Sequence, residues 1–178
     1  MTNLSQAARK FIRDWGELSD RWGVDRTTAE VHALLWLAGT PLDLKSVADA
    51  LMIESEEAAH GLEALREAGI ATLADRSGGS LRYAVPADAW EMFRAILEER
   101  RRRELEPAVA VIRDAVLRCD SDPEGDDRTR DRLEQLQGFL RDANTFYRQM
   151  STMPAPVFRQ LLRTGAKIRK ALGLDAAP

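Results

Sequence analysis

LMIESEEAAHGLEALREAGI, residues 51–70, has two opposite faces when it is drawn as a helix. Small and aliphatic residues recur at intervals of three and four on one side: Ala58, Leu62, Leu65 and Gly69. At about 100° per residue, a second set lies on the other side: Glu56, His60, Glu63 and Glu67. The stretch is therefore predicted to be a helix with one side in a core and an acidic side in solvent.

Two helical patterns precede this stretch. Residues 4–22 place apolar side chains on one face, at Leu4, Ala8, Phe11, Trp15, Leu18 and Trp22. Thr27 and Glu30 fit a capping box, which predicts the start of a second helix. The sequence GTP at 39–41 should end that helix, because glycine and proline both interrupt helical backbone.

A short third helix is predicted directly before residues 51–70. Asp43 is a favourable N-cap, and Leu42 and Val47 are spaced as a hydrophobic staple. A short helix, a tight turn and a second helix together indicate a helix-turn-helix.

After this helix the spacing of apolar residues changes from a helical to a strand-like pattern. IATLAD at 70–75 and LRYAV at 81–85 are strand-like, and RSGGS at 76–80 joins them as a hairpin loop. Three helices followed by such a hairpin form a winged helix-turn-helix. The expected fold is therefore mainly α with a small β-hairpin wing.

Long helices are expected in the second half of the chain. Asp88 with Glu91 resembles an N-terminal cap, and Pro107 should kink or restart the helix that follows. DSDPEGDD at 120–127 is the clearest linker. The next helix carries a narrow apolar seam, suited to a partner helix, at Leu133, Leu136, Leu140, Ala143, Tyr147 and Met150. We therefore expect a winged helix-turn-helix domain over 1–87 and a helical dimerisation region over 88–178, joined in a homodimer.

Composition narrows the function classes. The net charge of −3 and a single cysteine, Cys119, argue against a strongly basic protein, an intramolecular disulfide and a cysteine-based zinc site. No stretch resembles a signal peptide, a membrane span or a catalytic motif. We therefore expect a cytoplasmic protein that is not an enzyme, with no metal site, no cofactor and no membrane partner.

These features resemble the MarR-type winged-helix regulators. The resemblance is carried by VHALLWLAGTPLDLKSVADAL, LREAGI, the glycine-containing wing and DAW…RRRRELEP, and it covers about residues 4–172. The most similar branch is the GbsR-like one, whose founding type responds to choline. The resemblance implies a homodimeric bacterial transcription factor that binds double-stranded DNA, with control by a small-molecule effector as a further option.

The second helix departs from that pattern. The family usually opens this helix with Ser-Lys-Gly or a similar sequence, whereas this chain has Glu54, Ser55 and Glu56. The residues that we expect to contact DNA are Lys45, Ser46, Ser55, His60, Arg66, Arg76 and Arg82. Carboxylates on the same side repel phosphates, so an alternative stays open: a winged-helix protein-interaction module with weak or lost DNA binding.

Two residue types allow a second interpretation. The four tryptophans, which could form an aromatic pocket for a cationic effector, are Trp15, Trp22, Trp36 and Trp90. Core packing also explains Trp15 and Trp22 well. Cys119 could sense peroxide, but a buried small hydrophobic role is favoured because no flanking group is fixed beside it.

Overall fold

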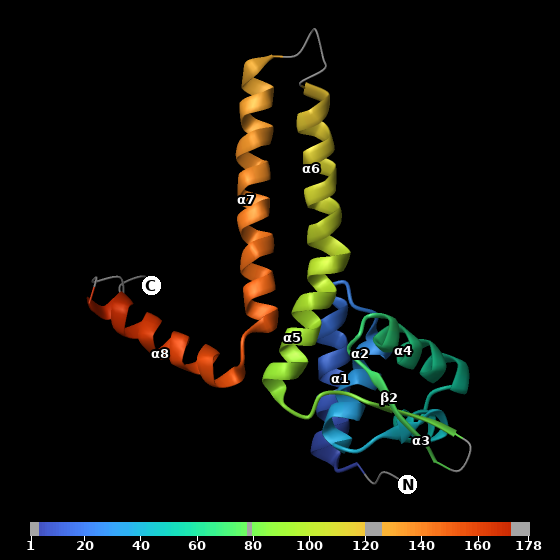
Figure 1. Cartoon of the computed structure of the whole chain (residues 1–178). Helices are drawn as coiled ribbons and strands as arrows, with labels where there is room; N and C mark the ends of the chain where they lie inside the picture. Colours follow the sequence, from blue (N-terminus) through green and yellow to red (C-terminus); the bar gives the residue numbers. More distant parts are fainter. Residues whose placement is uncertain (1–3, 78–79, 120–125, 172–178) are drawn as a thin grey trace. The chain divides into compact units, whose positions relative to one another are not determined.

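The computed structural model describes residues 4–77, 80–119 and 126–171 (Figure 1). The chain divides into two compact units, Met1–Glu99 and Arg100–Pro178. The first contains a small three-stranded antiparallel sheet, and the rest of the described chain is mainly helical. The expected fold class, mainly α with a small β wing, is confirmed.

The first unit is a winged helix built around one apolar core. Its elements are α1 (Gln6–Asp20), α2 (Arg26–Ala38), β1 (Leu42–Asp43), α3 (Leu44–Leu51), α4 (Ser55–Glu67), β2 (Thr72–Ser77), β3 (Ser80–Ala84) and α5 (Ala89–Arg100). The largest fully buried side chains come from α2, α3 and α4: Val31, Leu34, Val47 and Leu62. Hydrophobic burial of these residues fixes the three helices as one body.

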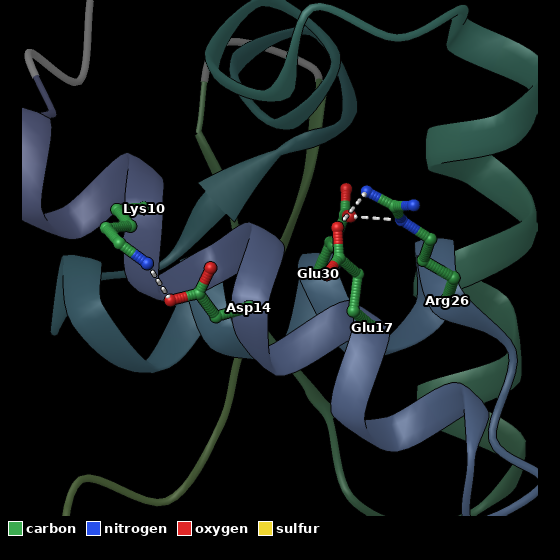
Figure 2. Close-up of polar contacts among 5 residues, drawn as sticks. All are labelled: Lys10, Asp14, Glu17, Arg26 and Glu30. Carbon is green, nitrogen blue, oxygen red and sulfur yellow. Dashed lines mark hydrogen bonds and ion pairs between the residues drawn. The ribbon is translucent and has the colours of Figure 1, made fainter.

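The start of α2 differs from the predicted capping box. Asp25 is the N-cap, and its carboxylate accepts a hydrogen bond from the backbone N–H of Thr28 at 2.8 Å. Glu30 instead forms an ion pair with Arg26 at 2.8 Å, as Figure 2 shows. The prediction of Thr27 as the cap was wrong because Asp25, two residues earlier, caps equally well and leaves Glu30 beside Gly16 of α1.

The sheet has one strand more than the predicted hairpin. Its order is β1-β3-β2, and β1 pairs with β3 through Leu42 opposite Tyr83 and Asp43 opposite Arg82. The hairpin itself is present as β2 and β3, while Gly78 and Gly79 of its loop lie outside the described residues. Pairing with β1 ties the wing to the residues that cap α3.

The second unit begins with a helical irregularity and continues as a helical hairpin. Its elements are the π-helical turn η1 (Arg101–Leu105), α6 (Glu106–Cys119), α7 (Asp127–Thr152) and α8 (Ala155–Ala171). The helix restarts next to Pro107, as predicted: the π turn η1 ends at Leu105 and α6 begins at Glu106. Proline cannot donate a backbone hydrogen bond, and the first turn of a helix does not need that donor.

The α6 and α7 helices lie side by side (Figure 1). Most of the predicted seam of α7 is at least half-buried, but other apolar residues of these two helices are exposed: Val111, Leu117, Phe139 and Phe146. α7 therefore packs on α6 of its own chain and still presents apolar surface. Of the predicted linker, residues 120–125 lie outside the described part, and Asp126 caps α7. None of the helices in the described residues is long and apolar enough to cross a membrane.

Candidate nucleic-acid interface

The turn between α3 and α4 sets the direction of the second helix. Met52 ends α3 in the left-handed conformation, with φ of 58°, and its side chain is 78% exposed. The backbone N–H of Ile53 donates to the carbonyl of Ala48 at 3.2 Å, which closes the end of α3. A left-handed residue at this point is typical of a helix C-terminus, although glycine is more usual there. The next helix, α4, begins three residues after Met52, at Ser55.

A close contact fixes α4 against α2. A Cβ atom added to Gly61 would lie 3.0 Å from Cγ2 of Val31 and 3.5 Å from Cα of Thr28. Gly61 therefore allows the two helices to approach closely. On the same side of α4, Ala58, Leu62 and Leu65 are buried, as the sequence pattern predicted. Gly69, the fourth residue of the predicted stripe, is exposed and lies beyond the end of the helix. The opposite side of α4, which carries the acidic residues, faces solvent.

Several of these acidic residues have structural partners. Glu54 is the N-cap of α4, and the carboxylate of Glu57 accepts a hydrogen bond from the backbone N–H of Glu54 at 3.3 Å. Glu63 accepts from Nε of Arg66 at 2.8 Å, and this hydrogen bond lowers the pKa of Glu63. Capping and pairing thus account for three glutamates, while Glu56 and Glu67 remain as charges on the exposed side.

His60 lies on the exposed side of α4, as predicted. It is close enough to Asp25, the N-cap of α2, to affect its ionisation. Burial alone would raise the pKa of Asp25, but hydrogen bonds from Thr28 and the charge of His60 lower it. The imidazole is therefore placed where the N-terminus of α2 meets α4.

The predicted phosphate donors of α3 are engaged locally. Lys45 forms an ion pair with Asp49 at 2.9 Å, and this contact raises the pKa of Lys45. The backbone N–H of Ser46 donates to Asp43 at 2.7 Å. Backbone and side-chain hydrogen bonds from Ser46 lower the pKa of Asp43, with the nearby charge of Arg82 as a smaller cause. Asp43 is thus the N-cap that the sequence predicted. Ser55, the first residue of α4, is exposed.

The wing arginines differ in what the structure shows. Arg82 of β3 is half-buried and donates a hydrogen bond to the backbone carbonyl of Pro41. It therefore helps to hold the wing to the segment that leads into α3. Simple strand alternation could not reveal this contact, because it depends on the pairing of β3 with β1. Arg76 of β2 stands opposite Leu81 in the register, and its side chain lies outside the described part of the structure.

The four tryptophans occupy several places in the first unit. Trp15 stacks on Phe11 at 5.8 Å between ring centroids and meets Trp22 edge-on at 6.1 Å. Trp90 lies 5.5 Å from Phe93. Trp36 lines a small hollow with Pro41, Val85 and Pro86. The hollow contains only one of the four predicted residues, so the structure places Trp36, and not the whole set, in a candidate pocket.

Cys119 is a free, half-buried thiol at the end of α6. The sequence predicted no charged group fixed beside this thiol. Its partial burial fits the smaller, packing role that the sequence favoured.

Comparison with solved structures supports the architecture. The chain is similar to a protein described as "Crystal Structure of a transcriptional regulator", with a TM-score of 0.63, over 82% of this chain and 95% of that chain. The two sequences are 13% identical, so the likeness shows a shared fold. No family model and no curated protein matches the chain.

Proposed function

We propose that the protein is a homodimeric transcriptional regulator that binds double-stranded DNA through α4 and the wing. The observation that carries this proposal is the arrangement of α3, α4 and the β2–β3 wing around one core. The likeness to a solved transcriptional regulator over most of both chains supports it. In such folds the second helix of the helix-turn-helix enters the major groove.

The proposed contacts are those that the sequence singled out. Lys45 and Arg66 are paired with carboxylates, but both pairs are exposed and join residues three or four positions apart. Exposed pairs of this kind contribute little to stability because water and salt screen them, so a DNA phosphate can replace the carboxylate. Ser55 and His60 remain accessible, whereas Arg82 would act mainly by holding the wing in place.

Exposed apolar surface on the second unit supports a dimer. Phe139 and Phe146 of α7 are 67% and 59% exposed, and Val111 of α6 is 66% exposed. Large apolar side chains grouped on a helical hairpin commonly mark a protein–protein contact. A second copy of the chain would cover them and would give the twofold symmetry of most operator sites.

The resemblance to MarR-type regulators of the GbsR-like branch extends the proposal to an effector. The hollow at Trp36 has a volume of about 40 Å³, far below the roughly 300–1,000 Å³ of pockets that hold drug-sized ligands, so it does not provide the site of such an effector. Trp15 and Trp90 pack against aromatic neighbours, whereas Trp22 is 52% exposed, so the expectation of core packing fails for Trp22. The location expected for such a regulator is the cytoplasm.

One observation favours a second candidate function. The unit Met1–Glu99 contains 10 Lys and Arg against 17 Asp and Glu, a net charge of −7. A winged helix with this charge repels DNA at long range and attracts basic proteins. The alternative is therefore an interaction module whose acidic α4 side binds a basic protein surface.

Removing the exposed carboxylates of α4 separates the two functions. Glu56→Gln with Glu67→Gln changes two charges that neither cap a helix nor form the Glu63–Arg66 pair. A carboxylate about 4 Å from a phosphate costs roughly 1 kcal/mol in water. If α4 enters the groove, we expect this variant to bind the protein's own upstream DNA about tenfold more tightly or better, as measured by fluorescence anisotropy.

The matched control is Asp131→Asn with Asp142→Asn, which changes two exposed carboxylates of α7 by the same amount. It should alter DNA affinity much less. Equal effects of the two variants would contradict groove entry by α4. If the unsubstituted dimer shows no preference for its upstream DNA over a scrambled duplex at low salt, DNA regulation is the wrong function and the interaction module is favoured.

A further inference from the structure

The last helix, α8, differs in charge from every other helix of the described residues. Its 17 residues contain no Asp or Glu, and they contain five cations: Arg159, Arg163, Lys167, Arg169 and Lys170. Each of the helices α1 to α7 contains at least one carboxylate. The unit Arg100–Pro178 has 16 Lys and Arg against 12 Asp and Glu, a net charge of +4. The excess of basic charge thus belongs to the second unit and not to the winged helix.

Four of the five cations follow one line along α8. Arg159, Arg163, Lys167 and Lys170 are spaced by four, four and three residues, so they share one side of the helix. Arg169 is the exception. The apolar residues Val157 and Leu161 fall on the other side and are about half exposed. One side of α8 can therefore contact protein while the other remains available to an anion.

The two described side chains of this row have no anionic partner in the described structure. Arg159 and Arg163 are exposed, and no described residue forms an ion pair or hydrogen bond with either. By contrast, Lys45 and Arg66 are both held by carboxylates. Like charges four residues apart destabilise an isolated helix, so a bound polyanion would relieve a repulsion that the helix carries throughout its length.

The spacing favours a ligand with repeated charges. Each step of four residues advances about 6 Å along a helix, so the row spans about 16 Å. Double-stranded DNA has one negative charge per about 1.7 Å of axis, which is dense enough to meet every cation of the row. A single phosphate or carboxylate would meet only one or two of them.

We infer that the cationic row of α8 binds the phosphate backbone of DNA and supplies attraction that the acidic winged helix lacks. This inference rests on the proposed function. It assigns the sequence-independent part of binding to the helical unit and the selection of bases to α4 and the wing. Basic and acidic surfaces in one chain then have separate tasks in the same complex.

The test is the salt dependence of DNA affinity for Arg159→Gln with Arg163→Gln. Each phosphate contact contributes close to one unit to the slope of log affinity against log salt. We expect the variant to lose about two units of slope per protomer between about 50 and 200 mM salt. Affinity for the upstream and scrambled duplexes should fall by the same factor. Arg159→Lys with Arg163→Lys should retain the slope.

The matched control is Arg118→Gln with Arg141→Gln, which removes two arginines that interact with Asp114 and Gln137. An unchanged slope in the Arg159 and Arg163 variant, or an equal loss in the control, would overturn the inference. Circular dichroism and light scattering of each variant establish that the fold and the mass are unchanged.

Two further measurements distinguish the sources of failure. If the unsubstituted protein binds upstream and scrambled DNA equally, the proposed function fails, while the slope still tests α8. Flotation with phosphatidylglycerol and phosphatidylcholine vesicles tests a lipid surface as the anion. Vesicle binding that depends on Arg159 and Arg163, with no change in the DNA slope, would replace DNA by a membrane surface and overturn the inference.

Discussion

The two units of the chain bury their apolar residues to very different extents. In Met1–Glu99, four large side chains from α2, α3 and α4 are fully buried in a core shared by three helices. In Arg100–Pro178, Met150 is the one buried hydrophobic residue among those described, and phenylalanines of α7 are exposed. The first unit thus holds the apolar core, whereas the second leaves large apolar side chains exposed.

The largest effect should come from substitution in the first core. Leu34 is 0% exposed, and Leu34→Ala should lower the free energy of unfolding by about 2–5 kcal/mol through lost burial and a cavity. Tryptophan fluorescence during denaturation measures this, because all four tryptophans lie in the first unit. Phe139→Ala in α7 should leave that transition within about 0.5 kcal/mol and reduce the mass in light scattering. If both variants weaken the transition equally, the two units are not independent.

An intermediate effect should follow from the one buried imidazole described in the first core. His32 is 6% exposed, its Nε2 has no hydrogen-bond partner, and burial lowers its pKa from 6.5 to about 4. The unfolded chain therefore binds a proton at a higher pH than the folded one. The free energy of unfolding is therefore unaffected by protonation of His32 above about pH 6.5. It falls as the pH drops from 6.5 towards 4, by roughly 3 kcal/mol in total.

Denaturation at pH 7.5 and pH 4.5 measures this difference. His32→Leu should reduce the pH dependence, because leucine cannot take up a proton. His60→Gln is the matched control, because it removes an exposed imidazole and leaves the buried one in place. Equal pH dependence in His32→Leu and the unsubstituted protein would show that other groups are responsible.

The smallest expected effect is the difference in stability between alanine variants at two helical glycines. A Cβ at Gly138 of α7 meets nothing within 4 Å, so Gly138→Ala should stabilise the helix by up to about 1 kcal/mol. A Cβ at Gly61 of α4 meets Val31 at 3.0 Å, so the same gain should be cancelled or reversed by crowding. Thermal melting followed by circular dichroism compares the two. A larger gain at Gly61 than at Gly138 would contradict the close approach of α4 to α2.

Local patterns in the sequence predicted most of the first unit. Asp43 caps α3, the buried side of α4 follows the three-and-four spacing, and the strand-like runs form the wing. These features depend on neighbours within a few residues, which a sequence displays directly. The N-cap of α2 was predicted wrongly because two adequate caps stand close together, and contact with α1 is not visible in the local sequence.

Features that depend on distant parts of the chain were not predicted. β1 has only two residues, and only its pairing with β3 makes it a strand. The contact of Arg82 with Pro41 follows from that pairing, so an arginine expected at phosphates is engaged with the backbone. The seam of α7 suggested a partner helix, but sequence spacing does not tell whether that helix belongs to the same chain.

The separation of charge between the two units has a practical consequence. The net charge of −3 is the difference between an acidic unit and a basic one, and it describes neither. Such a protein should be retained near neutral pH by both anion-exchange and cation-exchange media, through different surfaces. Its isoelectric point would then be a poor guide to its purification, and elution from the two media would report separately on each half of the molecule.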